Sequence, residues 1–370
     1  MKGSKDIVFI RADLWNTTKA LPKAIEAAGP LFDNISILEW SKHSSVDENR
    51  FKSTPHLLLS FRGSVGSSGI GRVLSVIHFL VWVLAHLKRI KPNYIHFIGI
   101  YNIPAVLLFK IFNPRTVLVY EIRDPYAFLF RRKALSFLLH HLDRLLMRFT
   151  NFIILPNEYL LDYVSTAISR DRIFISPNYG RIKEGDTDSS FNGDKMNFGY
   201  FGYLSGERGL KMMENLVRNY QNEIILHLAG NFNESIIKVF RKYENVIYHG
   251  HVNRMEALNL MKSVDANLML YDPDIKLHSY MLPIKFYDSC MQGTPVIVSK
   301  GMAALESEVT SHGLGYSLEY MKDSDLGKLI QEMRRSPVEA KLLQDYFFKK
   351  CNYEEFMLGY HKFYKNITNE

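Results

Sequence analysis

Lys285 and Asp288 have the residue types and the spacing for binding a phosphorylated sugar. Residues three apart on a helix project from one face, and Pro283 suits the first turn of a helix. A helix N-terminus that carries a lysine attracts phosphate, because its backbone N–H groups and the side chain both present positive charge. An aspartate on the same face can accept hydrogen bonds from sugar hydroxyls. This pattern predicts a site for a nucleotide-phosphate sugar.

Arg208 is a second cation that suits a phosphate. It follows a strand-like run and a glycine-containing turn in MNFGYFGYLSGERGLKMM (196–213), just before a predicted helix. A guanidinium beside a helix start is a good bidentate phosphate ligand. The segment therefore predicts a second phosphate contact.

Glu121 and Asp124 are the candidates for acid–base chemistry. They stand at the carboxyl end of a strand expected at 116–121, where open α/β sheets place their ligands. Asp124 is the first candidate for a general base and Glu121 the second. An equally weighted alternative is that the acid caps a helix that follows Pro125.

The segment LPIKFYDSCMQGTPVIVS (282–299) resembles the C-terminal signature of GT-B glycosyltransferases, in particular the GT4-like enzymes of bacterial polysaccharide assembly. The commoner form of this signature has two glutamates separated by seven residues, and here Tyr280 and Asp288 hold those positions. The segment 196–213 is similar to the family's Gly-x-x-x-x-x-Lys/Arg-Gly element. Gly202, Arg208 and Gly209 match it, and Tyr203 stands where the family often has an arginine.

The resemblance implies contacts for each part of a nucleotide sugar. It assigns the donor phosphates to Gly202, Arg208 and Lys285. It assigns the ribose and the sugar to Tyr280, Asp288 and Glu306, and the base to backbone groups of Gly250, His251 and Val252.

The resemblance also places the first loop on the acceptor side, through Arg11, Asp13 and Asn16. Solvated loop residues are an equally good interpretation of these three. Asp272 and Asp274 form a D-x-D, which is interpreted as loop chemistry, so no metal site is expected.

Two series of alternating strands and helices must position these residues. The first opens with strands at 6–11 and 35–40, and the second begins at Met196. With the resemblance, they predict an α/β protein of GT-B fold: two Rossmann-like, doubly wound domains that face a cleft, with a C-terminal helix that crosses back to the first domain. The expected parts are an acceptor domain, a linker, a donor domain and a terminal helix, at 1–178, 179–195, 196–345 and 346–370.

Charge and composition limit the possible partners of the protein and its cellular compartment. The 370 residues carry a net charge of +8, which favours an anionic partner: a nucleotide, a membrane surface or a nucleic acid. Two cysteines make no disulfide framework and the N-terminus shows no signal peptide, so the cytoplasm is expected. Helices at 73–87 and 128–149 mix apolar and basic residues, as in peripheral membrane proteins and also in ordinary packed helices. The first is interpreted as buried or interfacial, not as membrane-spanning.

These features predict a hexosyltransferase-type glycosyltransferase. It would move a sugar from a nucleotide-diphospho-sugar to a hydroxyl of a saccharide, expected to be lipid-linked, in surface polysaccharide assembly at the inner face of the plasma membrane. No metal or other cofactor is expected, because Arg208 and Lys285 would neutralise the leaving diphosphate. The alternative is a non-catalytic nucleotide-sugar-binding protein on a degenerate GT-B frame. Nucleic-acid binding is a weaker alternative, since no recognised module is present.

Overall fold

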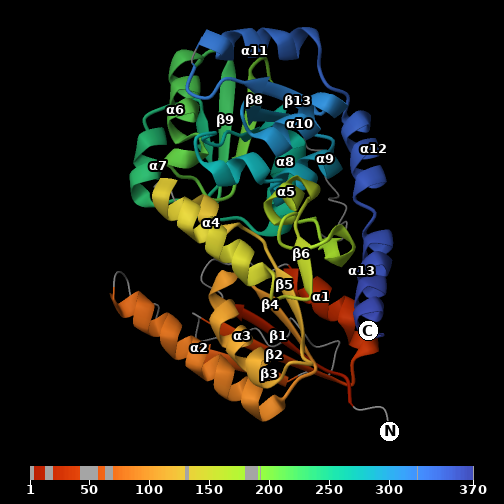
Figure 1. Cartoon of the computed structure of the whole chain (residues 1–370). Coiled ribbons are helices and arrows are strands. Elements are labelled where there is room, and N and C mark those ends of the chain that lie inside the picture. The colour runs from red at the N-terminus through yellow and green to blue at the C-terminus, as the bar shows by residue number, and fades with distance from the viewer. Residues whose placement is uncertain are drawn as a thin grey trace. The chain divides into compact units, whose positions relative to one another are not determined.

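The chain folds into two compact units, each built on one parallel sheet (Figure 1). The computed structural model describes residues 4–12, 20–41, 57–62, 70–129, 133–179, 191, 193–322 and 324–369. One unit comprises Met1–Asn178 and Glu354–Glu370, and the other comprises Tyr179–Tyr353. The domain boundaries expected from the sequence stay predictions.

The N-terminal unit contains a seven-stranded parallel sheet in the order β3-β2-β1-β4-β5-β6-β7. Its strands are β1 Asp6–Ala12, β2 Asn34–Ser41, β3 Leu57–Arg62, β4 Tyr94–Ile98, β5 Val117–Glu121, β6 Phe152–Leu155 and β7 Ile173–Ile175. Winding proceeds in one direction from β1 to β3 and in the other from β4 to β7. The predicted doubly wound arrangement is thereby confirmed.

Helices cover both faces of this sheet: α1 Ala20–Ala28, α2 Ile70–Ile90, α3 Ile103–Phe112, α4 Lys133–Met147, α5 Leu161–Val164 and α13 Tyr353–Ile367. The connections β3–α2–β4, β4–α3–β5 and β5–α4–β6 all run in one direction across the sheet. Right-handed crossovers therefore place α2, α3 and α4 on one face. Figure 1 shows α2 and α3 on that face and α1 with α13 on the other.

The predicted return of the C-terminal helix to the first domain is confirmed. Tyr360, Tyr364 and Ile367 of α13 are fully buried in the same hydrophobic core as Phe9 and Ile35 of the sheet. The helix is therefore part of the N-terminal unit, although 175 residues of the other unit precede it in the chain.

α2 combines a membrane-like composition with a packed inner face. Its segment Val73–Ile90 is long and apolar enough to cross a membrane. Phe79, Val83 and Leu87 are nevertheless fully buried, and Phe79 packs on Trp40 of β2 with ring centroids 5.1 Å apart. These contacts make α2 one of the helices that cover the sheet.

The C-terminal unit repeats the design with six parallel strands in the order β10-β9-β8-β11-β12-β13. The strands are β8 Met196–Phe201, β9 Ile224–Ala229, β10 Val246–Tyr248, β11 Ala266–Met269, β12 Val296–Ser299 and β13 Gly315–Leu318. Its helices are α6 Leu210–Asn219, α7 Glu234–Phe240, α8 Arg254–Ser263, α9 Ile284–Gln292, α10 Ala303–His312, α11 Ser324–Arg335 and α12 Ala340–Lys350.

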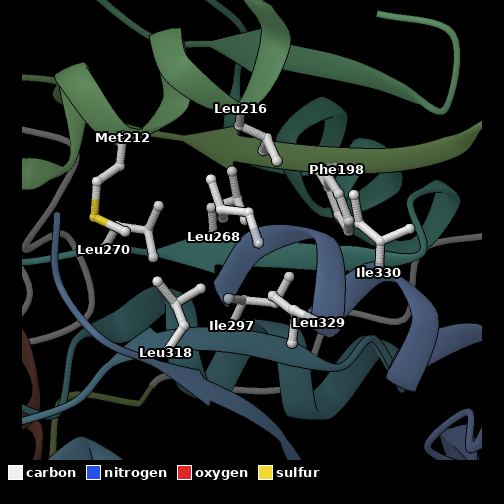
Figure 2. A pocket seen from close by; sticks show the side chains of 10 residues that line it. Phe198, Met212, Leu216, Leu268, Leu270, Ile297, Leu318, Leu329 and Ile330 are labelled. Carbon is white, nitrogen blue, oxygen red and sulfur yellow. The ribbon is translucent and has the colours of Figure 1, made fainter. Parts of the chain in front are cut away.

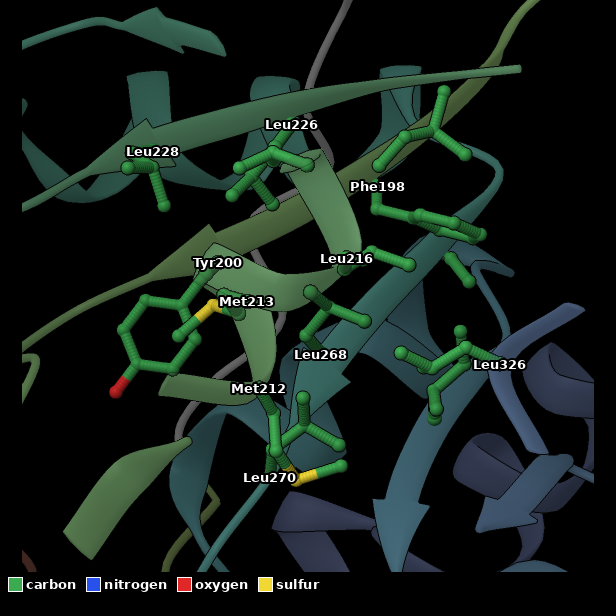
Figure 3. Close-up of a cluster of buried hydrophobic side chains, with 14 of the residues drawn as sticks. Phe198, Tyr200, Met212, Met213, Leu216, Leu226, Leu228, Leu268, Leu270 and Leu326 are labelled. Carbon is green, nitrogen blue, oxygen red and sulfur yellow. The ribbon is translucent and has the colours of Figure 1, made fainter. Parts of the chain in front are cut away.

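One hydrophobic core of this unit lies between the sheet and α6, α7 and α11 (Figure 3). Figure 2 shows a void within it that is lined only by apolar side chains such as Phe198, Leu216 and Leu268. A ligand site needs a few polar groups to orient its occupant, so this void is a packing feature. Tyr200 lies in the same core, and its hydroxyl donates to the carbonyl oxygen of Tyr203 at 2.6 Å.

Candidate functional site

Three glycines follow the neighbouring strands β8, β9 and β10 at the carboxyl edge of the C-terminal sheet. Gly202, Gly230 and Gly250 have φ values of +128°, +149° and +78°, which favour glycine. A Cβ on Gly230 would lie 2.2 Å from the carbonyl oxygen of Gly202. The loops therefore hold bare backbone at the edge where open α/β sheets bind ligands.

Arg208 and Lys285 approach this edge from two helix starts. Arg208 immediately precedes the N-cap of α6, and Lys285 is the second residue of α9. The Lys285 Nζ lies 4.1 Å from the ring centroid of Tyr200 and 5.2 Å from that of Tyr271. The Arg208 guanidinium lies 5.7 Å from the centroid of Tyr271. Both predicted phosphate ligands therefore lie within 5.7 Å of the ring centroid of Tyr271.

The electrostatics of this pair favour an anion. Within the described part of the chain, no carboxylate forms an ion pair with Arg208 or Lys285. Burial, and then the charge of Arg208, lower the pKa of Lys285 to about 7. Burial also raises the pKa of Tyr271 to about 12, so this ring keeps its hydroxyl proton at neutral pH. Two cations and two helix N-termini suit a diphosphate.

Asp288 has a protein partner that the sequence did not reveal. Its carboxylate oxygens accept hydrogen bonds from the two terminal nitrogens of Arg254, at 2.7 and 3.0 Å. Arg254 is the first residue of α8, which starts at a capping box formed by Asn253 and Glu256. The capping pattern is visible in the sequence, but the pairing of α8 with α9 is a tertiary contact. The assignment of Asp288 to the ribose stays a prediction.

The remaining donor-side candidates lie on α10 and on a short 3₁₀ turn of the same unit. Glu306 is half-buried and accepts the N–H of Gly301 at 2.7 Å. Tyr280 ends the 3₁₀ turn Lys276–Tyr280 and is half-buried.

The predicted base-binding residues Gly250, His251 and Val252 follow β10 directly. Val252 lines an open pocket of about 400 Å³ together with Phe191 and His249. Contact of any of these residues with a nucleotide stays a prediction.

Asp272 is engaged in local hydrogen bonds. Its Oδ1 accepts the N–H of Asp274 at 3.0 Å, and its carbonyl oxygen accepts from Nδ1 of His278 at 2.7 Å. Burial lowers the pKa of His278, which keeps this imidazole neutral. The described residues include no group of three or more His, Cys, Asp or Glu side chains that could hold a metal.

The environment of Glu121 does not fit the predicted role of a second candidate for the general base. Its carboxylate is fully buried and accepts hydrogen bonds from His96 at 2.8 Å and from Arg123. Burial opposes ionisation, but Arg123 and His96 outweigh it and lower the pKa of Glu121 to about 2. His96 also contacts the hydroxyl of Tyr364 at 2.6 Å. A buried carboxylate of this pKa is a poor base at neutral pH, so its position indicates a structural role.

The other N-terminal candidates differ in their exposure and in their contacts. Asp124 is exposed just beyond β5, so it stays the candidate for a general base. Arg11 is buried, and its guanidinium lies 3.3 Å from Oε2 of Glu39 on the neighbouring strand. That contact favours a structural role over an acceptor contact. Asp13 and Asn16 lie outside the described residues.

Comparison with known proteins identifies the fold. No protein-family model and no curated protein matches the chain. Among solved structures, a sucrose-phosphate synthase from Thermosynechococcus elongatus is 13% identical, with a TM-score of 0.74 over 99% of both chains. The apo lipopolysaccharide outer core galactosyltransferase WaaB is 14% identical, with a TM-score of 0.67 over 98% of both chains. Anabaena HepE in complex with UDP and glucose is 13% identical, with a TM-score of 0.67 over 99% of both chains. These structures are GT-B glycosyltransferases, and the chain has their two-domain fold.

Proposed function

We propose that the protein is a glycosyltransferase that uses a nucleotide-diphospho-sugar donor. The observation that carries the proposal is the convergence of Arg208 and Lys285 on Tyr271, where none of the described carboxylates forms an ion pair with either cation. A pair of cations at two helix starts can hold a diphosphate in the ground state. It binds the diphosphate more strongly as negative charge builds on the leaving group, which lowers the barrier to transfer.

The chemistry would divide between the two units. Arg208 and Lys285 would stabilise the departing diphosphate, so that no metal ion is required. In an inverting reaction, Asp124 would take the proton of the attacking acceptor hydroxyl. In a retaining reaction, the leaving phosphate would take that proton and Asp124 would orient the acceptor.

The acceptor is proposed to be a lipid-linked saccharide in surface polysaccharide assembly, at the inner face of the plasma membrane. The similar structures include a lipopolysaccharide outer core galactosyltransferase, which supports an acceptor of this class. The basic net charge of +8 supports placement at an anionic membrane.

A nucleotide panel tests the proposed donor. UDP is expected to raise the melting temperature, with or without EDTA, because a ligand bound only by the folded state stabilises it. UDP is the first choice since HepE was solved with it, and GDP, ADP and CDP complete the panel. Lys285→Ala is expected to lose the shift, whereas Lys328→Ala on the exposed side of α11 keeps it. No shift with any nucleotide would contradict the proposal, and binding without turnover would support the non-catalytic alternative.

Affinity for UDP is expected to fall as the pH rises above about 7. The free protein loses the Lys285 proton near this pH, whereas a bound diphosphate favours the charged ammonium. Binding at higher pH therefore requires proton uptake, and each pH unit costs up to about tenfold in affinity. Titration calorimetry in two buffers of different ionisation enthalpy measures both the affinity and the proton uptake.

Lys285→Arg is the matched control for this pH dependence, since an arginine stays charged across the whole range. It is expected to bind UDP without proton uptake. An affinity that is independent of pH in the unaltered protein would show that Lys285 is already charged in the empty site.

A further inference from the structure

Exposed apolar side chains gather on one helical layer of the N-terminal unit. Twenty large apolar side chains are exposed in the described part of the protein, and twelve of them lie on or directly beyond α2, α3 and α4. They are Val73, Leu74, Ile77, Val81, Leu108, Ile111, Phe112, Phe137, Leu138, Leu142, Leu145 and Phe149. These three helices cover the same face of the sheet, so their outward sides form one surface, here called the apolar layer.

The outward face of α2 is uncharged over most of its length. From Val73 to Ala85 its exposed residues are Val73, Leu74, Ile77, His78, Val81 and Ala85, with no formal charge at neutral pH when the histidine is neutral. The next two exposed residues are Lys88 and Arg89. At 1.5 Å per residue, the uncharged face extends about 18 Å before it reaches the cations.

α3 and α4 also combine exposed apolar side chains with an exposed basic residue. Ile111 and Phe112 are 71% and 72% exposed, and Arg115 follows them. Phe137 and Leu138 are 66% and 63% exposed at the other end of α4 from the exposed Arg148. Each helix therefore presents apolar side chains with a basic residue at one end.

The stretch of sequence that contains most of this layer is strongly basic. Residues 49–142 contain thirteen lysines and arginines but only two acids, Glu121 and Asp124, which gives a net charge of +11. The whole chain carries +8, so all the other residues together carry −3. Among the described residues, the exposed cations Lys88, Arg89, Lys91, Arg115 and Arg148 lie at or beyond the C-terminal ends of these helices. A surface that combines exposed apolar side chains with cations complements a bilayer of anionic lipids.

We propose that the apolar layer inserts into the boundary between headgroups and acyl chains of an anionic membrane, with α2 lying in the membrane plane. This extends the membrane placement proposed above and rests on it, but it does not depend on the transfer chemistry. The sequence indicated helices that mix apolar and basic residues, and the structure turns apolar side chains of these helices outward. Binding should therefore persist at high salt.

Two other occupants fit the surface less well. A second copy of the chain, docked through the same layer, would bring two segments of net charge +11 together. A nucleic acid would use the cations but would leave the twelve apolar side chains without a partner. Insertion of α2 across the bilayer would expose Phe79, Val83 and Leu87, which are fully buried against the sheet.

Flotation with vesicles tests the proposal. The full chain is mixed with vesicles of phosphatidylcholine and phosphatidylglycerol and centrifuged through a density gradient, at low salt and at about 1 M salt, where the Debye length is ~3 Å. The unaltered protein is expected to float under both conditions. The double variant Val81→Glu with Phe112→Glu is expected to bind vesicles at least about tenfold more weakly, because it removes two inserting side chains.

Leu358→Glu is the matched control, because Leu358 is 72% exposed on α13, on the opposite side of the sheet. It is expected to float like the unaltered protein. Failure of the unaltered protein to float, complete release at high salt, or a double variant that floats normally would each overturn the proposal. So would sedimentation showing a dimer that the double variant dissociates. UDP binding by the double variant, measured separately, is expected to be unchanged, so that failure of docking and failure of the donor site are distinguished.

Discussion

Replacing Lys285 with methionine is expected to lower kcat/KM for sugar transfer by about 10³-fold. The change keeps the apolar stem but removes the ammonium that lies 4.1 Å from the ring of Tyr200 and leaves Arg208 as the only cation of the pair. Removing one preorganised group that stabilises developing charge costs roughly 10²–10³-fold, and here a full positive charge is lost from a partly buried position. Because the charge on the leaving diphosphate builds during the reaction, kcat should fall more than KM rises.

The same variant should not lose stability. Lys285 is held next to Arg208 in a site that lowers its pKa to about 7, so its charge is a cost to the folded protein. Urea unfolding is expected to give an unchanged or higher free energy of unfolding for Lys285→Met. Lys285→Arg and Lys328→Met complete the kinetic comparison. A loss of kcat/KM below tenfold, or a loss confined to KM, would remove the proposed role in the transition state.

Glu121→Ala is expected to lower the free energy of unfolding by about 3–5 kcal/mol, because it leaves Arg123 without its buried carboxylate partner. His96 loses the same partner, although its contact with Tyr364 remains. The lowered pKa gives the sign of the pH dependence. The stabilisation by Glu121 is fully present above its ordinary pKa of 4.5 and is lost as the pH falls towards about 2. Urea unfolding of both proteins at neutral pH and at about pH 3 measures this effect.

Asp124→Asn is compared with Glu121→Ala in the same unfolding measurement and in a turnover assay. Asp124 is exposed, so the free energy of unfolding should change little, whereas turnover of an inverting enzyme should fall by roughly 10²-fold or more. If Glu121→Ala unfolds like the unaltered protein but loses turnover, Glu121 is the base after all. If neither variant affects turnover, the proton of the acceptor hydroxyl goes elsewhere, as in the retaining reaction.

The fold was largely predictable from the chain because its strands are short apolar runs with clear boundaries. The run Val296–Ser299, for example, is buried along its whole length, as the sequence indicates for a parallel strand covered on both faces. The positions of Arg208 and Lys285 beside helix starts were also predictable, since local sequence patterns define both starts, whereas their contact with a donor stays a prediction.

The partners of the site residues were not predictable, because they come from distant parts of the chain. Arg254 and Asp288 are 34 residues apart, and His96 and Tyr364 are 268 residues apart. Local patterns define a helix face but not the helix that packs against it. The outward face of α4 was not predictable for the same kind of reason: which side chains are covered depends on the sheet beneath the helix.

The position of α13 in the N-terminal core has a consequence for how the protein is made. Tyr360, Tyr364 and Ile367 fill a core whose other buried members lie in the first 154 residues. A ribosome adds about 5–20 residues per second, so the 175 residues of the second unit separate these two parts by roughly 9–35 s. During that interval the part of this face that α13 covers and α1 does not stays exposed, and when α13 is made the C-terminal unit already has its complete set of strands. The first domain to be synthesised is therefore the last to finish folding, and its exposed face is the surface that a chaperone would have to protect.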